Sequence, residues 1–156
     1  DIVVFAIPIR NINKILNTDY ESQYFANKTI YISSNVKKFG NTILLIPNEN
    51  LALNSIQCLS NVSSSYSKNE NSLYSASTLD ATKSDEELFQ EFNKITNISK
   101  DHSKIIKSYT LPYSLPSDFK KISMKNNFYF CGDWNTEPSI DGAIKSGRLI
   151  AEQINA

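Results

Sequence analysis

The residues best suited to chemistry lie near the C-terminus. Gly132 and Asp133 directly follow an apolar, strand-like run from Phe128 to Cys131, and a helical pattern begins after Ser139. Ligands bind at the carboxyl ends of strands in α/β sheets, so the Asp133 carboxylate is placed to accept a hydrogen bond from a sugar-like hydroxyl. The N–H groups of the first helical turn, residues 140–143, favour an electron-rich oxygen. The segment therefore indicates a ligand site.

Small side chains recur along the same helical pattern. Gly142 and Ser146 are four residues apart, as are Ala143 and Gly147, so two adjacent rows of small side chains lie on the helix. Such rows let a flat ring or another backbone approach closely. They also serve tight helix packing, and a Gly–Asp pair after a strand is a common turn. Spacing alone leaves both interpretations open.

Composition excludes several classes of function. Only four of the 156 residues are glycine, and three of them fall between residues 132 and 147. Neither G-x-G-x-x-G nor G-x-x-x-x-G-K-[ST] is present, so the sequence has no glycine-rich loop for phosphate. Sixteen basic and sixteen acidic side chains give a formal net charge of zero, which argues against nucleic acid as a partner. The apolar runs are far shorter than the roughly 20 residues of a membrane span, so no transmembrane segment is expected.

The first residues and the cysteines set further expectations. Asp1 leads directly into the apolar run from Ile2 to Ile7, without the layout of a signal peptide. We therefore expect a fragment of a longer, cytoplasmic protein. Cys58 and Cys131 lie in apolar strand-like runs and are expected to be free thiols. His102 is the only histidine and lies in a polar stretch, so we expect it to be exposed and expect no metal site.

The elements that position these residues begin with a strand and a helix. The run from Ile2 to Ile7 predicts a strand buried on both faces, and a helix is predicted over residues 9–17. The buried stripe of this helix is predicted to be Ile9, Ile12, Ile15 and Leu16. Four β-like segments then predict an antiparallel sheet: Thr29 to Ser33, Thr42 to Ile46, Ser55 to Leu59 and Leu73 to Thr78. The serine-rich stretch over residues 63–67 is interpreted as a hairpin loop.

Two further helices and two strands follow. Ser84 and Glu87 form a capping box, which predicts a helix from residue 84. Its buried stripe is predicted to be Leu88, Phe89, Phe92 and Ile95. Strand character returns from Lys104 to Leu111, where a proline is predicted to end it. The last elements are a strand over residues 128–131 and a helix over residues 139–155.

These C-terminal residues resemble the C-terminal FAD-binding motif of the flavin-containing amine oxidase superfamily, which includes phytoene-desaturase-like and protoporphyrinogen-oxidase-like enzymes. In that family an apolar strand ends in Gly plus an acidic residue, and a helix begins with a Gly-Ala…Ser-Gly pattern. Gly132-Asp133, Gly142-Ala143 and Ser146-Gly147 match this motif in order and approximate spacing. Residues 1–8 resemble the family's strand that ends in Ala-x-Pro, and residues 109–116 resemble its segment with Tyr and Pro before the final strand.

The resemblance implies an α/β (α+β) fold, in which the strand and helix of an FAD-binding, Rossmann-like domain accompany a mostly antiparallel substrate-domain sheet with a helix. It implies that residues 1–20 belong to the FAD-binding domain, residues 21–116 to the substrate domain, and residues 117–156 to the C-terminal FAD-binding strand, loop and helix. The implied function is an FAD-dependent oxidoreductase that oxidises a small organic molecule by hydride transfer to flavin, with no catalytic residue assigned. The chain alone is expected to be inactive and to self-associate. The implied cofactor-binding residues are Gly132, Asp133, Trp134, Ser139, Ile140, Gly142 and Ala143.

Other interpretations remain open from the sequence. The chain could be a self-contained α+β binding module whose last helix only packs on a sheet, or a flavoprotein relative that has lost catalysis. Trp134 is interpreted either as a neighbour of the flavin ring or as a half-buried anchor. Four aromatic residues are candidates to line a substrate cavity, although aromatic residues on strands more often belong to a core: Tyr109, Tyr113, Phe119 and Tyr129.

Overall fold

The computed structural model describes residues 1–21, 23–47, 49–67, 70–117, 122 and 127–155. The chain divides into two compact units. The strand–helix unit contains residues 1–25 and 113–156, and the sheet unit contains residues 26–112. The assignment of cofactor and substrate domains to this chain stays a prediction. None of the helices in the described residues has the length and hydropathy of a membrane span.

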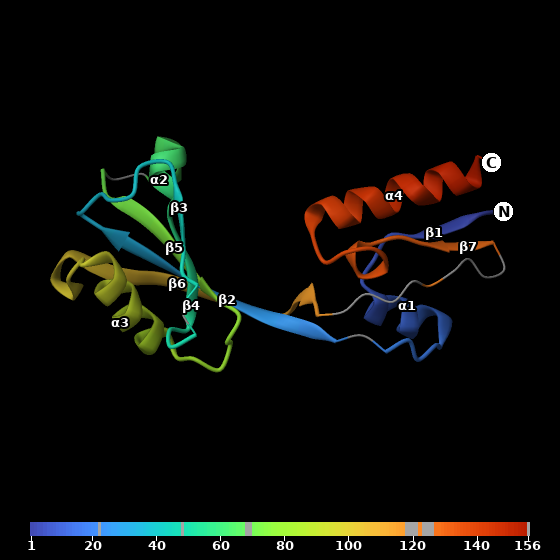
Figure 1. The fold of residues 1–156 in the computed structure, drawn as a ribbon, viewed down its shortest axis with the longest axis horizontal. Helices are drawn as coiled ribbons and strands as arrows, with labels where there is room; N and C mark the ends of the chain where they lie inside the picture. Colours follow the sequence, from blue (N-terminus) through green and yellow to red (C-terminus); the bar gives the residue numbers. More distant parts are fainter. Residues whose placement is uncertain (22, 48, 68–69, 118–121, 123–126, 156) are drawn as a thin grey trace. The chain divides into compact units, whose positions relative to one another are not determined.

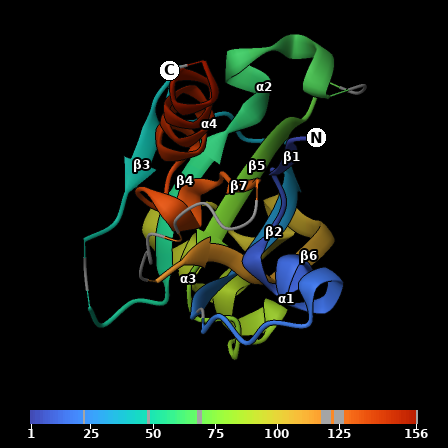
Figure 2. The same ribbon diagram turned by 90° about the vertical axis from the view of Figure 1, so that its right-hand side faces the viewer.

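The strand–helix unit is built around two parallel strands. Its elements are β1 (Val3–Phe5), α1 (Ile9–Leu16), β7 (Phe128–Phe130), the short 3-10 helix η3 (Asp133–Asn135) and α4 (Ile140–Ile154). Strands β1 and β7 pair in parallel, and α1 and α4 lie on opposite faces of the pair (Figure 1, Figure 2). The predicted strands and helices of this unit are therefore confirmed.

Aromatic and branched side chains form the core of this unit. Ile9 and Ile12 of α1 are buried against Phe130 of β7, whose ring stacks on Phe5 at a centroid distance of 5.6 Å. The predicted stripe of α1 is wrong at Ile15, which is 61% exposed because it points away from this cluster.

The prediction that the first strand is buried on both faces is also wrong. Ile2, Val3 and Val4 are each more than two-fifths exposed. Strand β1 has a single neighbour, β7, in the described part of the chain, and no described element covers these side chains. A continuous apolar run indicates what a strand can bury, whereas its actual burial depends on the elements placed beside it.

The sheet unit is dominated by one five-stranded sheet in the order β3-β4-β5-β2-β6. The strands are β2 (Tyr24–Ser34), β3 (Ile43–Leu45), β4 (Leu53–Cys58), β5 (Ser72–Thr78) and β6 (Ser103–Pro116). Neighbouring pairs from β3 to β2 are antiparallel, as predicted. The chain passes between the two units within β2 and within β6. Together with the parallel pair, this sheet confirms the α+β fold class.

Helix α3 (Asp85–Thr96) covers one face of the sheet (Figure 1). The predicted capping box is confirmed: the Ser84 hydroxyl accepts a hydrogen bond from the Glu87 N–H, and the Glu87 carboxylate accepts one from the Ser84 N–H at 2.8 Å. The predicted stripe packs on the sheet, with Leu88 and Phe92 fully buried.

Short helices connect the remaining strands. Helix α2 (Leu59–Val62) and the 3-10 helix η1 (Ser64–Tyr66) lie between β4 and β5, so the predicted hairpin loop contains helical turns. The 3-10 helix η2 (Lys100–His102) precedes β6 and carries His102, which is exposed as predicted.

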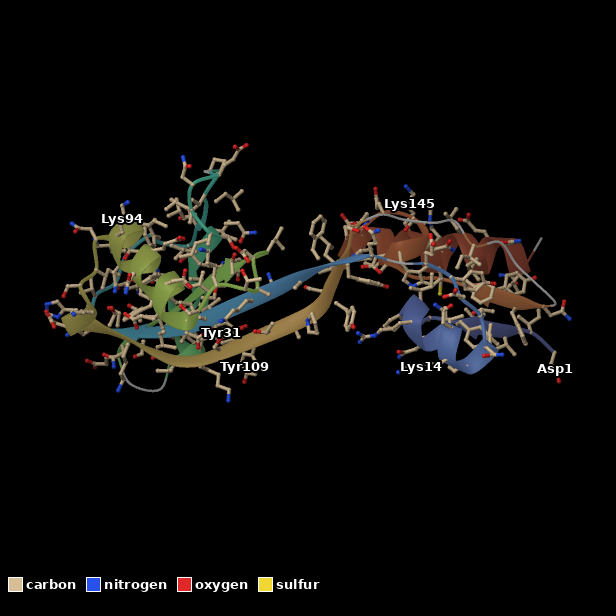
Figure 3. All side chains as sticks on the ribbon, turned by 90° about the horizontal axis from the view of Figure 1, so that it is seen from below. Asp1, Lys14, Tyr31, Lys94, Tyr109 and Lys145 are labelled. Carbon is tan, nitrogen blue, oxygen red and sulfur yellow. The ribbon has the colours of Figure 1, made fainter. Side chains whose placement is uncertain are left out.

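Strand β6 differs from its prediction, because it continues past Leu111 and through Pro112 to Pro116. A proline is tolerated there because β6 lies at the edge of the sheet, where a missing N–H need not break a ladder. Figure 3 shows Tyr109 of this strand beside Tyr31 of β2, with the two rings edge to face at a centroid distance of 5.9 Å.

Candidate functional site

A cavity of about 350 Å³ in the strand–helix unit lies at the carboxyl ends of β1 and β7. One part of its lining is the segment Ala6 to Pro8, which follows β1, and another is the segment Cys131 to Trp134, which follows β7. The parallel register brings these segments together, because Phe5 lies opposite Phe130. This edge of a parallel sheet is where ligands bind, and the volume suits a small molecule or part of a larger one.

The structure brings together four of the seven predicted cofactor-binding residues. Those that line the cavity are Gly132, Asp133, Trp134 and Ala143. Those outside its lining are Ser139, Ile140 and Gly142, which lie at the start of α4. The whole assignment to a cofactor stays a prediction.

Trp134 connects the two segments that line the cavity. Its indole N–H donates a hydrogen bond to the Ile7 carbonyl at 3.2 Å, and the side chain is only 3% exposed, so it is fully buried rather than half-buried. A Cβ added at Gly132 would collide with this indole. Gly132 is therefore required by the packing of the protein itself.

Asp133 is one of the residues that line the cavity. One of its oxygens accepts a hydrogen bond from the Trp134 N–H at 2.9 Å, which fixes the carboxylate at the end of β7. No cation in the described residues forms an ion pair with it. The carboxylate is thus held in place with accepting capacity left for a ligand hydroxyl.

The N-terminus of α4 is partly satisfied by its own cap. The Ser139 hydroxyl accepts a hydrogen bond from the Gly142 N–H at 2.8 Å, and the Ser139 carbonyl accepts one from the Ala143 N–H at 3.0 Å. The first two N–H groups, those of Ile140 and Asp141, have no acceptor within the helix. Of the N–H groups of residues 140–143, which were predicted to favour an electron-rich oxygen, two therefore remain as donors for a ligand.

The two rows of small residues on α4 have different surroundings. Gly142 and Ser146 are buried: a Cβ at Gly142 would collide with the Glu137 carbonyl, and the Ser146 hydroxyl accepts a hydrogen bond from the Gly132 N–H at 3.0 Å. No atom lies within 4 Å of a Cβ added at Gly147. The first row thus serves packing within the protein, whereas Gly147 leaves open space.

Other residues of the cavity were not assigned to it from the sequence. Arg10, Tyr24 and Ser114 line it, together with Tyr113, which had been a candidate for a substrate cavity. The Arg10 guanidinium carbon lies 4.2 Å from the centroid of the Tyr113 ring. Arg10 stands two residues after the Ala-x-Pro segment. This position beside the motif is the sequence signal that could have indicated Arg10 as a residue of the cavity.

The remaining aromatic candidates and the cysteines lie elsewhere or are inert. Tyr129 is buried in β7, and Phe119 lies outside the described residues. Both cysteines are free and buried, as predicted. Burial raises the pKa of the Cys131 thiol, which therefore stays protonated beside the cavity. The described residues contain no cluster of side chains that could hold a metal ion.

The donor set fits one part of a flavin nucleotide. Asp133 lines the cavity and supplies an acceptor for the hydroxyl groups of a polyol, whereas the N–H groups of Ile140 and Asp141 lie at the start of α4, outside the cavity lining. The cavity is too small for a whole dinucleotide, and the sequence carries no glycine-rich phosphate loop. The residues that line the cavity thus suit the ribityl portion of such a molecule.

No protein-family model matches the chain, and no curated protein matches its sequence. Solved structures are nevertheless similar to it. A protein from Pyrococcus furiosus is 17% identical, with a TM-score of 0.63 over 94% of this chain and 35% of that one. An oxidoreductase from Methanosarcina mazei is 12% identical, with a TM-score of 0.59 over 92% of this chain and 37% of that one.

A third similar structure is a provisionally assigned protoporphyrinogen oxidase from Exiguobacterium sp. 255-15. It is 12% identical, with a TM-score of 0.66 over 99% of this chain and 41% of that one. The chain therefore spans between 35% and 41% of the length of these three proteins. At such identities the similarity establishes the fold, and this chain has the fold of one segment of proteins that include an oxidoreductase.

Proposed function

We propose that this chain is the C-terminal part of an FAD-dependent oxidoreductase of the flavin-containing amine oxidase superfamily, which oxidises a small organic molecule by hydride transfer. The observation that carries the proposal is the parallel pairing of β1 and β7. It places the Ala-x-Pro segment that ends at Pro8 and the Gly132–Asp133 pair at one edge, around one cavity. Both segments resemble motifs of that superfamily, although they are separated by more than a hundred residues in the sequence.

The residues of this chain then have defined roles. Asp133 would accept a hydrogen bond from a ribityl hydroxyl, and the N–H groups of Ile140 and Asp141 would supply donors to an electron-rich ring edge. Ala143 and Gly147 present small side chains, so a flat ring can approach α4. Bound flavin supplies the redox chemistry by accepting a hydride. The N-terminus of α4 would stabilise negative charge at that ring edge, and it would thereby favour a reduced flavin.

The flavin content of the intact protein tests the proposal. We expect the protein expressed from its complete gene to purify with bound flavin and with absorbance in the visible range. Asp133→Ala removes an acceptor that is charged, and such hydrogen bonds contribute about 1.5–3 kcal/mol, so flavin affinity should fall roughly tenfold to a hundredfold. Asp133→Asn keeps the oxygen that accepts from the Trp134 N–H, and it should give an intermediate loss.

Asp101→Ala is the matched control, because Asp101 is an exposed acidic residue on η2 of the sheet unit. Its flavin content should equal that of the unchanged protein. A complete gene product without flavin would refute the proposal, and it would favour a binding module. Full flavin occupancy in Asp133→Ala would refute the role of Asp133.

A further inference from the structure

The cavity of the strand–helix unit contains a cation that the flavin proposal does not use. Arg10 lies in the first turn of α1, and its guanidinium stacks on the ring of Tyr113. The Tyr113 ring in turn meets the Tyr24 ring edge to face, at a centroid distance of 6.0 Å. All three side chains line the cavity.

Stacking on an aromatic ring prepares a guanidinium for an anion. The ring holds the plane of the group, while the N–H donors point outward from its edge and stay available. That planar fork matches the two oxygens of a carboxylate. A preorganised arginine loses less side-chain freedom on binding than a mobile one, so the stack favours recognition.

No carboxylate in the described part of the chain forms an ion pair with Arg10. The chain has one other arginine, Arg148 on α4, which pairs with Glu152 at 3.7 Å. Asp133 lines the same cavity, yet the two groups form no ion pair with each other. The cavity is therefore lined by one cationic and one anionic residue that do not pair with each other. A ligand that fits this cavity carries an anionic group for Arg10 and a hydroxyl or amine group for Asp133.

The elements around Arg10 favour a substrate group over a cofactor group. Tyr24 and Tyr113 belong to β2 and β6, which are strands of the five-stranded sheet. The residues assigned to flavin come instead from the segment after β7 and from α4. Both tyrosines lie in the strand–helix unit, on the parts of β2 and β6 that lead into the sheet unit, and residues 21–116 are the range that we propose for substrate.

We propose that Arg10 binds a carboxylate of the substrate, so that the substrate is an organic carboxylate whose body packs on the rings of Tyr24 and Tyr113. Arg10 is thereby a specificity-determining residue, which separates carboxylates from neutral molecules of the same shape. The inference rests on the proposed function for the chemistry that follows binding. The binding itself is measured without flavin.

Arginine side-chain NMR on the isotope-labelled 156-residue chain tests this inference, because two arginines give two side-chain N–H signals. Benzoate should shift the Arg10 signal in a saturable manner and leave the Arg148 signal in place. Benzamide, the neutral molecule of the same shape, should bind at least roughly tenfold more weakly. Arg10→Lys should weaken benzoate binding by a similar factor, followed in this variant through the signals of benzoate itself, because lysine lacks the planar fork, whereas Arg148→Lys should not change it.

Three results would overturn the inference. If pyrophosphate shifts the Arg10 signal and benzoate does not, the anion belongs to a cofactor. If both arginine signals move alike, the effect is unspecific ion binding. If benzoate and benzamide bind equally, the carboxylate is not recognised. Absence of flavin from the intact protein, with saturable benzoate binding at Arg10, would refute the proposed function and leave the carboxylate site standing.

Discussion

Replacement of Gly132 by alanine gives the sharpest test of how the cavity is built. The backbone at Gly132 is extended, with φ at 160°, so alanine meets no conformational penalty there. The penalty is steric, because the new methyl group would occupy the position of the Trp134 indole. The indole is buried and hydrogen-bonded to the Ile7 carbonyl, so it must leave that position.

The magnitude follows from these two losses. Overpacking a buried site costs about 1–3 kcal/mol, and a lost hydrogen bond adds about 0.5–1.5 kcal/mol. We therefore expect Gly132→Ala to lower the free energy of unfolding of the strand–helix unit by about 1.5–4.5 kcal/mol. Gly147→Ala is the matched control: its methyl group meets no atom within 4 Å, and alanine in a helix interior is favoured by roughly 0.5–1 kcal/mol.

The assay is denaturant unfolding followed by tryptophan fluorescence, because Trp134 is the single tryptophan of the chain. Gly132→Ala should also shift the native emission to longer wavelength, as the indole becomes exposed. Trp134→Phe in the same chain should recover part of the loss, since a smaller ring leaves room for the methyl group. Unchanged stability and unchanged emission in Gly132→Ala would refute the steric argument.

Two further predictions concern α3 of the sheet unit. The hydrogen bonds from Ser84 lower the pKa of Glu87 from 4.5 to about 2. The contribution of Glu87 to stability is therefore present above pH 4.5 and is lost as the pH falls toward 2. Circular dichroism should show this loss of stability, and Glu87→Gln should remove that part of the pH dependence. Lys28 pairs with Asp85 at 2.7 Å, and the Asp85 side chain is 43% exposed, so solvent screening limits the effect of Lys28→Met to about 1 kcal/mol. A double-mutant cycle with Asp85→Asn measures it, and a coupling energy of zero would show that the pair does not stabilise α3.

Local signals in the sequence predicted well where helices α3 and α4 begin. The capping box at Ser84 and the N-cap at Ser139 each depend on residues three positions away, so the pattern that predicts the helix contains the atoms that start it. The aromatic strand at 128–130 followed by Gly132 and Asp133 was recognisable for the same reason. These local features account for the part of the site that lies after β7.

The rest of the site depends on contacts between distant residues. Arg10 and Tyr113 are about a hundred positions apart, and nothing near either residue indicates that they stack. The exposure of Val3 and Val4 depends on which strands lie beside β1, and the passage of β6 through Pro112 depends on its edge position. Such facts are properties of the assembled sheet, so patterns within single elements could not predict them.

The prolines of β6 have a consequence for how copies of this chain meet. Pro112 and Pro116 lack the N–H groups that an incoming strand would need, and β3 at the other edge has only three residues. Both edges of the large sheet are thus poor templates for a strand of another molecule. Self-association through strand pairing would therefore fall to the parallel pair of β1 and β7, in which each strand has a single neighbour in the described part of the chain.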